Sequence, residues 1–142
     1  MKQDPSKVAL VTGAGRGIGL EVARLLLAKG YRVLAVSREG VDAQRLGGAR
    51  AQLRTERADV TDYAAMQALV DSAREQWGPV SVLMNNAGIS PKQADGNSSG
   101  ILDITPAEWE SVLQVNLTSI LRLCQMVLPG MRDQGWGRIV NV

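Results

Sequence analysis

The chain has 142 residues with 16 basic and 14 acidic side chains, which fits a single domain over residues 1–142, and its scattered positive charge excludes a nucleic-acid partner. Cys124 is the sole cysteine and histidine is absent, which excludes an internal disulfide, a Cys/His metal site and a Ser/His or Cys/His nucleophile pair. No apolar stretch approaches the roughly 20 residues of a bilayer span, and residues 1–5 lack the apolar centre of a signal peptide, so we expect a soluble cytoplasmic protein without a membrane partner.

The first part of the chain predicts a strand, a helix and a second strand. Lys7 to Thr12 is a short β-branched run closed by glycines, typical of a strand buried on both faces. Gly30 is free to adopt the left-handed conformation that ends a helix, and Tyr31 to Ser37 predicts the second strand. The intervening helix is predicted to bury an apolar stripe made of Ile18, Val22, Leu25 and Leu26.

The middle of the chain predicts the third and fourth strands. A polar stretch from Arg38 to Arg50 includes a short helix around Asp42 to Leu46, and Ala51 to Ala58 is a weak third strand. Gly78-Pro79 ends the next helix, and Val80 to Met84 is the fourth strand. The apolar residues of that helix recur at helical spacing: Met66, Leu69, Val70, Ala73 and Trp77.

The last part predicts a long helix and a fifth strand. After a linker-like stretch from Ser90 to Gly100, Thr105-Pro106-Ala107-Glu108 combines a capping box with proline at the first helical position. The helix extends to about Met131, and Gly137 to Val142 is the fifth strand. Its predicted buried stripe consists of Trp109, Leu113, Ile120, Leu123 and Val127.

Strict alternation of strands and helices predicts a doubly wound α/β fold with a parallel sheet, because parallel neighbours need a crossover helix. In the Rossmann-type nucleotide-binding version the strands lie in the order 3-2-1-4-5. Ligands then bind where the order reverses, at the carboxyl ends of strands one and four.

A glycine-rich turn, Thr12-Gly13-Ala14-Gly15-Arg16-Gly17-Ile18-Gly19, joins the first strand to the first helix. Its glycines let the backbone turn sharply and let a diphosphate approach the amides at the positive end of the helix. The strict G-x-G-x-x-G spacing is absent because Ile18 replaces its last glycine, and the lysine of an ATP-binding P-loop is absent too. A purely structural tight turn is the alternative interpretation.

Two further motifs follow strands at the same predicted edge: Asp59-Val60 after strand three and Asn85-Asn86-Ala87-Gly88 after strand four. Together with T-G-x-x-x-G-I-G, these motifs resemble the short-chain dehydrogenase/reductase family, near its 3-oxoacyl-[acyl-carrier-protein] reductase branch. The resemblance runs from Lys7 to the last residue and implies an extended NAD or NADP molecule on this edge.

The resemblance assigns the parts of that cofactor to particular residues. Asp59 and Val60 are implied at the adenine, although Asp59 could equally act as a helix cap. The diphosphate and its nearby ribose are implied to contact Gly13, Gly15, Arg16, Gly17 and Ile18. The ribose on the nicotinamide side is implied to lie beside Asn86, Ala87 and Gly88.

The end of strand two bears on which nucleotide binds. An NAD enzyme places a carboxylate there for the ribose hydroxyls, about 20 residues after the glycines, whereas this chain has Ser37-Arg38. A guanidinium can grip a 2′-phosphate with two hydrogen bonds, and Arg16 could add a second positive charge. NADP(H) is therefore favoured, while Glu39 keeps NAD(H) possible and Arg38 could instead be a solvated loop charge.

Asn116 occupies the vacant step of the long helix's stripe, three residues after Leu113 and four before Ile120, so its amide is predicted to point into the core. A buried amide needs specific hydrogen bonds, for example to a neighbouring strand. The resemblance gives Asn116 a place in a catalytic tetrad. The family's serine, tyrosine and lysine are not found here, since neither Tyr31 nor Tyr63 has lysine four residues on.

We therefore expect the cofactor-binding half of an NAD(P)(H)-dependent oxidoreductase that acts on a carbonyl or secondary alcohol, truncated before its catalytic serine, tyrosine and lysine. A non-catalytic nucleotide-binding or sensing domain is the alternative, and a pure assembly module is a third. The assembly module could use the long helix 106–131, on which Leu117, Leu121 and Met131 lie partly off the stripe. The resemblance implies a homo-oligomer through this helix, because related enzymes pair through it. One wall of the substrate pocket is expected within Ser90 to Ile104. The polar residues of this stretch do not indicate a particular substrate: Lys92, Asp95 and Asn97.

Overall fold

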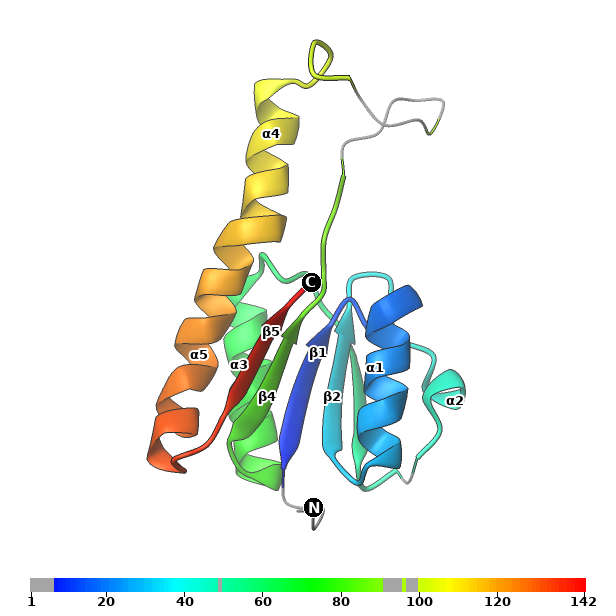
Figure 1. The fold of residues 1–142 in the computed structure, drawn as a ribbon, viewed down its shortest axis with the longest axis vertical. Coiled ribbons are helices and arrows are strands. Elements are labelled where there is room, and N and C mark those ends of the chain that lie inside the picture. The colour runs from blue at the N-terminus through cyan, green and yellow to red at the C-terminus, as the bar shows by residue number, and fades with distance from the viewer. Residues whose placement is uncertain (1–6, 49, 91–95, 97–99) are drawn as a thin grey trace.

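One parallel sheet organises the part of the chain that the computed structural model describes, residues 7–48, 50–90, 96 and 100–142. Its five strands lie in the order β3-β2-β1-β4-β5, as predicted (Figure 1). The edge strand β5 pairs only with β4 in this sheet. The strands are β1 (Val8–Thr12), β2 (Arg32–Ser37), β3 (Leu53–Arg57), β4 (Val80–Asn85) and β5 (Arg138–Asn141).

Helices cover both faces of the sheet because each central strand is apolar on both sides. In β1, Val8 and Leu10 pack toward α3 (Tyr63–Trp77) and α5 (Ser119–Asp133). Their neighbours in β1 pack on the opposite face, toward α1 (Gly17–Ala28) and α2 (Ala43–Leu46). The doubly wound α/β prediction is therefore confirmed.

Three of the helices have a side-chain cap at their amino end. The Asp42 side chain accepts from the Gln44 amide at α2, and the Asp62 side chain accepts from the Ala65 amide at α3. At α4 (Pro106–Leu113) the predicted capping box is present, with Thr105 and Glu108 bonded reciprocally. These bonds satisfy amides that a helix leaves without internal partners. No side-chain cap is present at α1.

The buried face of α1 differs from the predicted stripe. Ile18 and Leu25 are 59% and 50% exposed, and Val22 and Leu26 are only partly buried. The predicted stripe was wrong because glycine and alanine, whose small side chains leave room for the sheet, also belong to the inward face. That face consists of Gly19, Leu20, Ala23 and Leu27.

The long helix is interrupted by a π-helical turn, η1 (Gln114–Thr118), between α4 and α5. A π-helical turn bonds five residues apart and shifts the helical phase, so a stripe counted at a constant period fails across it. Trp109 is 55% exposed and Leu113 and Ile120 are half-buried, whereas the predicted Leu123 and Val127 are buried. The buried residues are Val115, Ser119, Leu123, Val127 and Met131.

Asn116 is exposed, so the prediction that its amide points into the core was wrong. The same phase shift brings its neighbour Val115 inward instead, at 9% exposure. Met131 was also misplaced, since it lies in the core at 5% exposure. Leu117 and Leu121 are 63% and 57% exposed, as expected for residues off the buried stripe.

The continuous helix Pro106–Asp133 is long and apolar enough, by length and composition alone, to cross a membrane. This differs from the expectation that no stretch of the chain approaches a span. One such helix is weak support for a membrane location, because core helices meet the same criterion. In the described part of the chain, α5 packs one face against β4 and α3 through Leu123, Val127 and Met131, and 22% of the apolar window is buried.

Most of the linker-like stretch from Ser90 to Gly100 lies outside the described residues, including Lys92, Asp95 and Asn97. Cys124 is half-buried against the α3–α5 side of the core.

Candidate functional site

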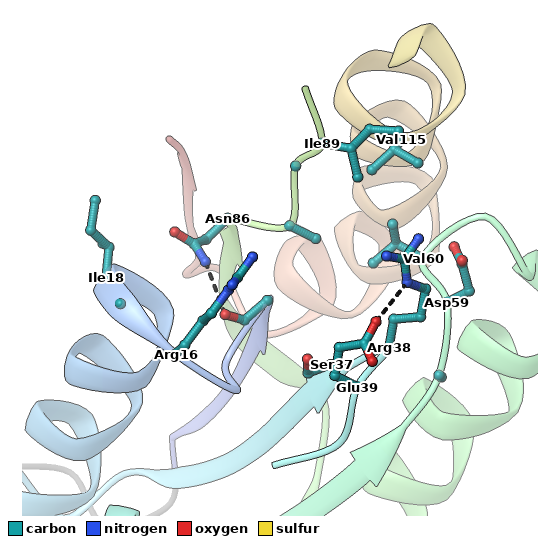
Figure 2. Close-up of a pocket in the computed structure, with 15 residues that line it drawn as sticks. Arg16, Ile18, Ser37, Arg38, Glu39, Asp59, Val60, Asn86, Ile89 and Val115 are labelled. Carbon is teal, nitrogen blue, oxygen red and sulfur yellow. Dashed lines mark hydrogen bonds and ion pairs between the residues drawn. The ribbon is translucent and has the colours of Figure 1, made fainter. Parts of the chain in front are cut away.

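A cavity of about 320 Å³ opens at the carboxyl edge of the sheet, where the strand order reverses between β1 and β4. The cavity lies between the glycine turn, the ends of β2 and β3, and the segment after β4 (Figure 2). A crevice at this switch point is where doubly wound sheets bind ligands. Its lining residues are Gly13, Arg16, Gly17, Ile18, Ser37, Arg38, Glu39, Ala58, Asp59, Val60, Asn86, Ala87, Gly88, Ile89 and Val115.

The glycine turn packs so closely that side chains could not replace its glycines. Gly13 and Gly17 adopt φ values of 63° and 56°, a region that favours glycine. A Cβ on Gly15 would lie 2.7 Å from the Gly40 carbonyl oxygen. One on Gly19 would overlap the Gly13 carbonyl oxygen and lie 2.5 Å from Asn86 Nδ2. The turn therefore presents bare backbone to the cavity.

The buried Thr12 hydroxyl ties the glycine turn to the segment after β4. It accepts hydrogen bonds from the backbone amides of Asn86 and Ala87, each at 3.1 Å, and donates to the Met84 carbonyl at 3.3 Å. The Asn86 side-chain amide in turn donates to the carbonyls of Thr12 and Gly13 at 3.1 and 3.2 Å. These bonds fix two walls of the cavity relative to each other.

The amino end of α1 faces the cavity without a side-chain cap. Arg16 occupies the N-cap position, makes no capping bond, and no acidic residue lies in the first turn. Gly17 and Ile18, the first helical residues, line the cavity. Unpartnered amides and the positive end of the helix dipole together make an anion-binding position. This arrangement suits a phosphate group of a ligand.

The end of β2 brings a cation and an anion into the cavity side by side. Arg38 Nε donates to Glu39 Oε1 at 3.3 Å, and both side chains are largely exposed. Figure 2 shows this pair on the side of the opening that faces Asp59 and Val60. Ser37, the last residue of β2, contributes its side chain to the same wall.

Asp59 stabilises the turn between β3 and α3 rather than capping the helix. Its carboxylate accepts from the Thr61 amide at 2.9 Å and from the Thr61 hydroxyl at 2.7 Å. These two bonds, with a smaller contribution from the Arg38 charge, hold the pKa of Asp59 below its ordinary value of 3.8. The helix cap is Asp62, so the alternative expectation that Asp59 caps the helix was wrong.

The Asn116 side chain bonds the long helix to the segment after β4 through one accepted and one donated hydrogen bond, as paired backbone groups do in a sheet. Its side-chain oxygen accepts from the Ile89 amide and its side-chain nitrogen donates to the Ile89 carbonyl, both at 2.9 Å. The expected structural bond to a neighbouring strand is instead a pair of bonds to the non-strand segment that follows β4. Asn116 sits in the π-helical turn, a feature frequent at functional sites, and directly follows the cavity residue Val115.

The structure gathers most of the predicted cofactor residues around one cavity. Of the twelve, eleven line it, and Gly15 instead packs against Ser37 and Gly40 beneath the turn. Asn116 lies beside the cavity and does not line it. The sequence analysis missed the apolar lining residues Ala58, Ile89 and Val115. Only the positions of Ala58 and Ile89, at strand ends flanking the motifs, could have indicated them.

The arrangement is suited to binding rather than to proton transfer. Uncapped amides, two arginines and a rigid glycine turn can hold an anionic ligand, and the apolar residues can contact a ring. Within the described part of the chain, no three His, Cys, Asp or Glu side chains gather as a metal site. Tyr63 bonds to Gln114 at 3.0 Å and does not line the cavity.

Comparison with known proteins gives one consistent result. The family model described as short chain dehydrogenase matches residues 7–142. The chain is 38% identical to acetoacetyl-CoA reductase of Paracoccus denitrificans over 137 residues, 96% of this chain and 54% of that protein. It is 36% identical to a 3-oxoacyl-[acyl-carrier-protein] reductase of Vibrio cholerae, with the same shares of the two chains covered.

A solved structure agrees with these relatives. A short-chain dehydrogenase from Streptomyces avermitilis superimposes with a TM-score of 0.80 at 28% identity, covering 95% of this chain and 48% of the other. The chain therefore spans about half the length of the curated relatives and the solved structure that it matches.

Proposed function

Because the chain belongs to the short-chain dehydrogenase family, we propose that it supplies the cofactor-binding half of an NAD(P)(H)-dependent oxidoreductase. The enzyme would transfer hydride between a nicotinamide and a carbonyl or secondary alcohol. The observation that carries the proposal is the uncapped amino end of α1 facing a cavity at the switch point of the sheet. Relatives named as reductases favour an enzyme over a non-catalytic sensing domain.

The proposed contacts combine the assignment that the family resemblance implies with the positions of these residues around the cavity. The amides of the glycine turn and the first turn of α1 would hold the diphosphate, with Arg16 adding charge. Asp59 and Val60 would contact the adenine, and the segment Asn86–Gly88 would contact the ribose on the nicotinamide side. The nicotinamide would supply the hydride chemistry, and this chain would hold the cofactor in place.

We propose that NADP(H) is preferred over NAD(H). Arg38 and Arg16 both line the cavity, and a guanidinium can bind a 2′-phosphate through two charge-assisted hydrogen bonds. Ser37 stands at the end of β2, where an NAD-specific site places a carboxylate, and it brings no negative charge.

Asn116 is proposed as the member of the catalytic machinery that this chain carries. Its side chain holds the Ile89 backbone through two hydrogen bonds, which fixes the segment leaving β4 beside the cavity. That segment would border the substrate. We also expect the 142-residue chain to bind nucleotide without turnover, since it contains no Tyr-x-x-x-Lys. The substrate class is limited to a carbonyl or secondary alcohol.

The exposed apolar face of the long helix supports a proposed homo-oligomer. Leu117, Leu121 and Leu128 are 63%, 57% and 42% exposed on this helix. Paired apolar faces of this kind bury surface in symmetric dimers. We also propose a cytoplasmic location, since the relatives that the chain matches are named as reductases and the other face of the helix packs on the sheet. Light scattering should show an oligomer that the double variant Leu117→Glu/Leu121→Glu converts to monomer, and a monomeric parent chain would refute this.

Calorimetric titration of the 142-residue chain with NADPH and NADH tests the function. Both nucleotides should bind at one site, NADPH more tightly, and Arg38→Gln should reduce the difference between them. Arg24→Gln is the matched control, because Arg24 is an arginine on the outer surface of α1 that pairs with Glu21 and does not line the cavity. Absence of binding by both nucleotides at millimolar concentration would reject the proposal.

A further inference from the structure

The two arginines of the cavity differ in whether their side chains already have a hydrogen-bond partner in the protein. The Arg16 side chain makes no hydrogen bond or ion pair with any residue that the structure describes. Arg38, by contrast, gives its Nε–H to Glu39 at 3.3 Å, and its charge also acts on Asp59. One cation is therefore open to a ligand, whereas the other already has a carboxylate beside it.

A tight turn places Arg38 and Glu39 on the same side. In a continuing strand, neighbouring side chains would point to opposite faces of the sheet. Here the Gly40 amide donates to the Ser37 carbonyl at 3.1 Å, and Gly40 adopts φ 91°. Arg57 Nε donates to the Arg38 carbonyl at 3.1 Å, which holds the turn against the end of β3. Both charged side chains consequently line the cavity.

We propose that Glu39 is a specificity-determining residue that acts through Arg38 and weakens the discrimination between NADP(H) and NAD(H). A 2′-phosphate must bond to a guanidinium whose Nε edge is already bonded to Glu39, so the carboxylate neutralises part of the positive charge that the phosphate would otherwise use. A ribose carrying only hydroxyls does not depend on the charge of Arg38. The inference rests on the proposed function, since it concerns the adenosine half of the same nucleotide site.

The test uses the two adenosine fragments that differ only at this position, adenosine 2′,5′-bisphosphate and 5′-AMP. Their dissociation constants for the 142-residue chain give a selectivity ratio. Glu39→Gln should raise the ratio in favour of the 2′-phosphorylated fragment by about three- to tenfold, because the variant keeps the side-chain size and removes the charge. The 5′-AMP affinity should change by less than about twofold.

A second arginine–glutamate pair provides the matched control. Glu21 accepts from Arg24 at 2.8 Å on the exposed side of α1, and neither residue lines the cavity. Glu21→Gln makes the same change in net charge and should leave the ratio within about twofold of the parent value. A ratio that rises equally in both variants would contradict a local role for Glu39.

A double variant separates action through Arg38 from direct repulsion. In an Arg38→Gln background, Glu39→Gln should change the ratio by less than about twofold, because the guanidinium to which both Glu39 and the 2′-phosphate would bond is absent. Raising the salt concentration to about 0.5 M should also shrink the single-variant effect, since the pair is exposed to solvent.

The outcomes distinguish this inference from the function on which it rests. A parent chain that binds neither fragment nor NADPH overturns the proposed function, and the role of Glu39 with it. A parent chain that binds both fragments, with a ratio unchanged in Glu39→Gln, overturns the role of Glu39 alone. A full effect of Glu39→Gln in the Arg38→Gln background also overturns it.

Discussion

Two walls of the cavity are built by opposite means. At the glycine turn, the absence of side chains lets the backbone approach Asn86 and the end of β2 within contact distance. At the junction of the long helix with the segment after β4, one side chain, Asn116, supplies both hydrogen bonds to Ile89. The first wall is tightly packed at Gly13, Gly15 and Gly19, whereas Asn116 in the second is exposed to solvent.

The difference indicates how each wall should respond to change. Added atoms at the glycine turn have no space, so they must displace backbone. Lost atoms at Asn116 can be replaced by water, so the cost is small and local. The predictions below test this contrast, beginning with the largest expected effect.

Gly19→Ala should be the most damaging single change. The new Cβ would overlap the Gly13 carbonyl oxygen and lie 2.5 Å from Asn86 Nδ2, so the turn must shift. We expect the free energy of unfolding in urea to fall by about 3 kcal/mol, at the upper end for overpacking. Gly88→Ala is the control, because its Cβ would meet the Asn116 side chain at an ordinary 3.5 Å. Equal losses in the two variants would contradict the contrast.

Thr12→Val should follow in magnitude. The variant has the same shape but leaves the partly buried amides of Asn86 and Ala87 without their acceptor. A loss of about 2 kcal/mol in the free energy of unfolding is expected from two partly buried donors that lose their acceptor. Thr12→Ser keeps the hydroxyl and should recover most of this loss. A Thr12→Val variant as stable as the parent would show that the bonds do not hold the two walls together.

Asn116→Ala should cost less, about 1 kcal/mol, because water can reach the freed groups of Ile89. Its clearest effect should be local, as faster hydrogen exchange of the Ile89 amide. The adjacent exposed Leu117→Ala should change neither quantity appreciably. If exchange at Ile89 stayed as slow as in the parent, the bonds of Asn116 would not be what fixes this segment.

The smallest effect concerns the protonation of Asp59. Hydrogen bonds from Thr61 lower the folded-state pKa below 3.8, so the carboxylate stabilises the fold above that pH and this contribution is lost as the pH falls through the folded-state pKa. Asp59→Asn should therefore remove part of the acid sensitivity, less than about 1 kcal/mol for a partly exposed group. Acid titrations of unfolding followed by circular dichroism measure this, with Asp71→Asn as control. Identical acid transitions in Asp59→Asn and the parent would contradict it.

Much of the fold and most of the cavity lining could be predicted from the sequence. The strand order followed from the alternation of strands and helices, and eleven of the twelve residues expected to contact a cofactor, most of them through the family resemblance, line the cavity. Such motifs can be recognised in a sequence because each depends on the backbone conformation that its own residues allow. The apolar wall at Ile89 and Val115 was missed, since an apolar residue facing a cavity has the same composition as one facing the core.

The helix faces were harder to predict, for two physical reasons. In α1, the small residues Gly19 and Ala23 face inward, which a search for large apolar side chains overlooks. In the long helix, the π-helical turn shifts the phase, so the predicted burial of Asn116 was wrong although Leu123 was placed correctly. Only tertiary packing reveals where such a turn occurs.

The central claim is that the amides at the β1–α1 junction bind the diphosphate of a nicotinamide nucleotide. Titration of the ¹⁵N-labelled chain with NADPH, followed by amide chemical shifts, tests it most directly. The account predicts saturable shifts at Gly17, Ile18 and Gly19, accompanied by shifts at Val60 and Ala87 on the facing walls. Binding that shifts other surfaces and leaves the amides of this junction unchanged would contradict it.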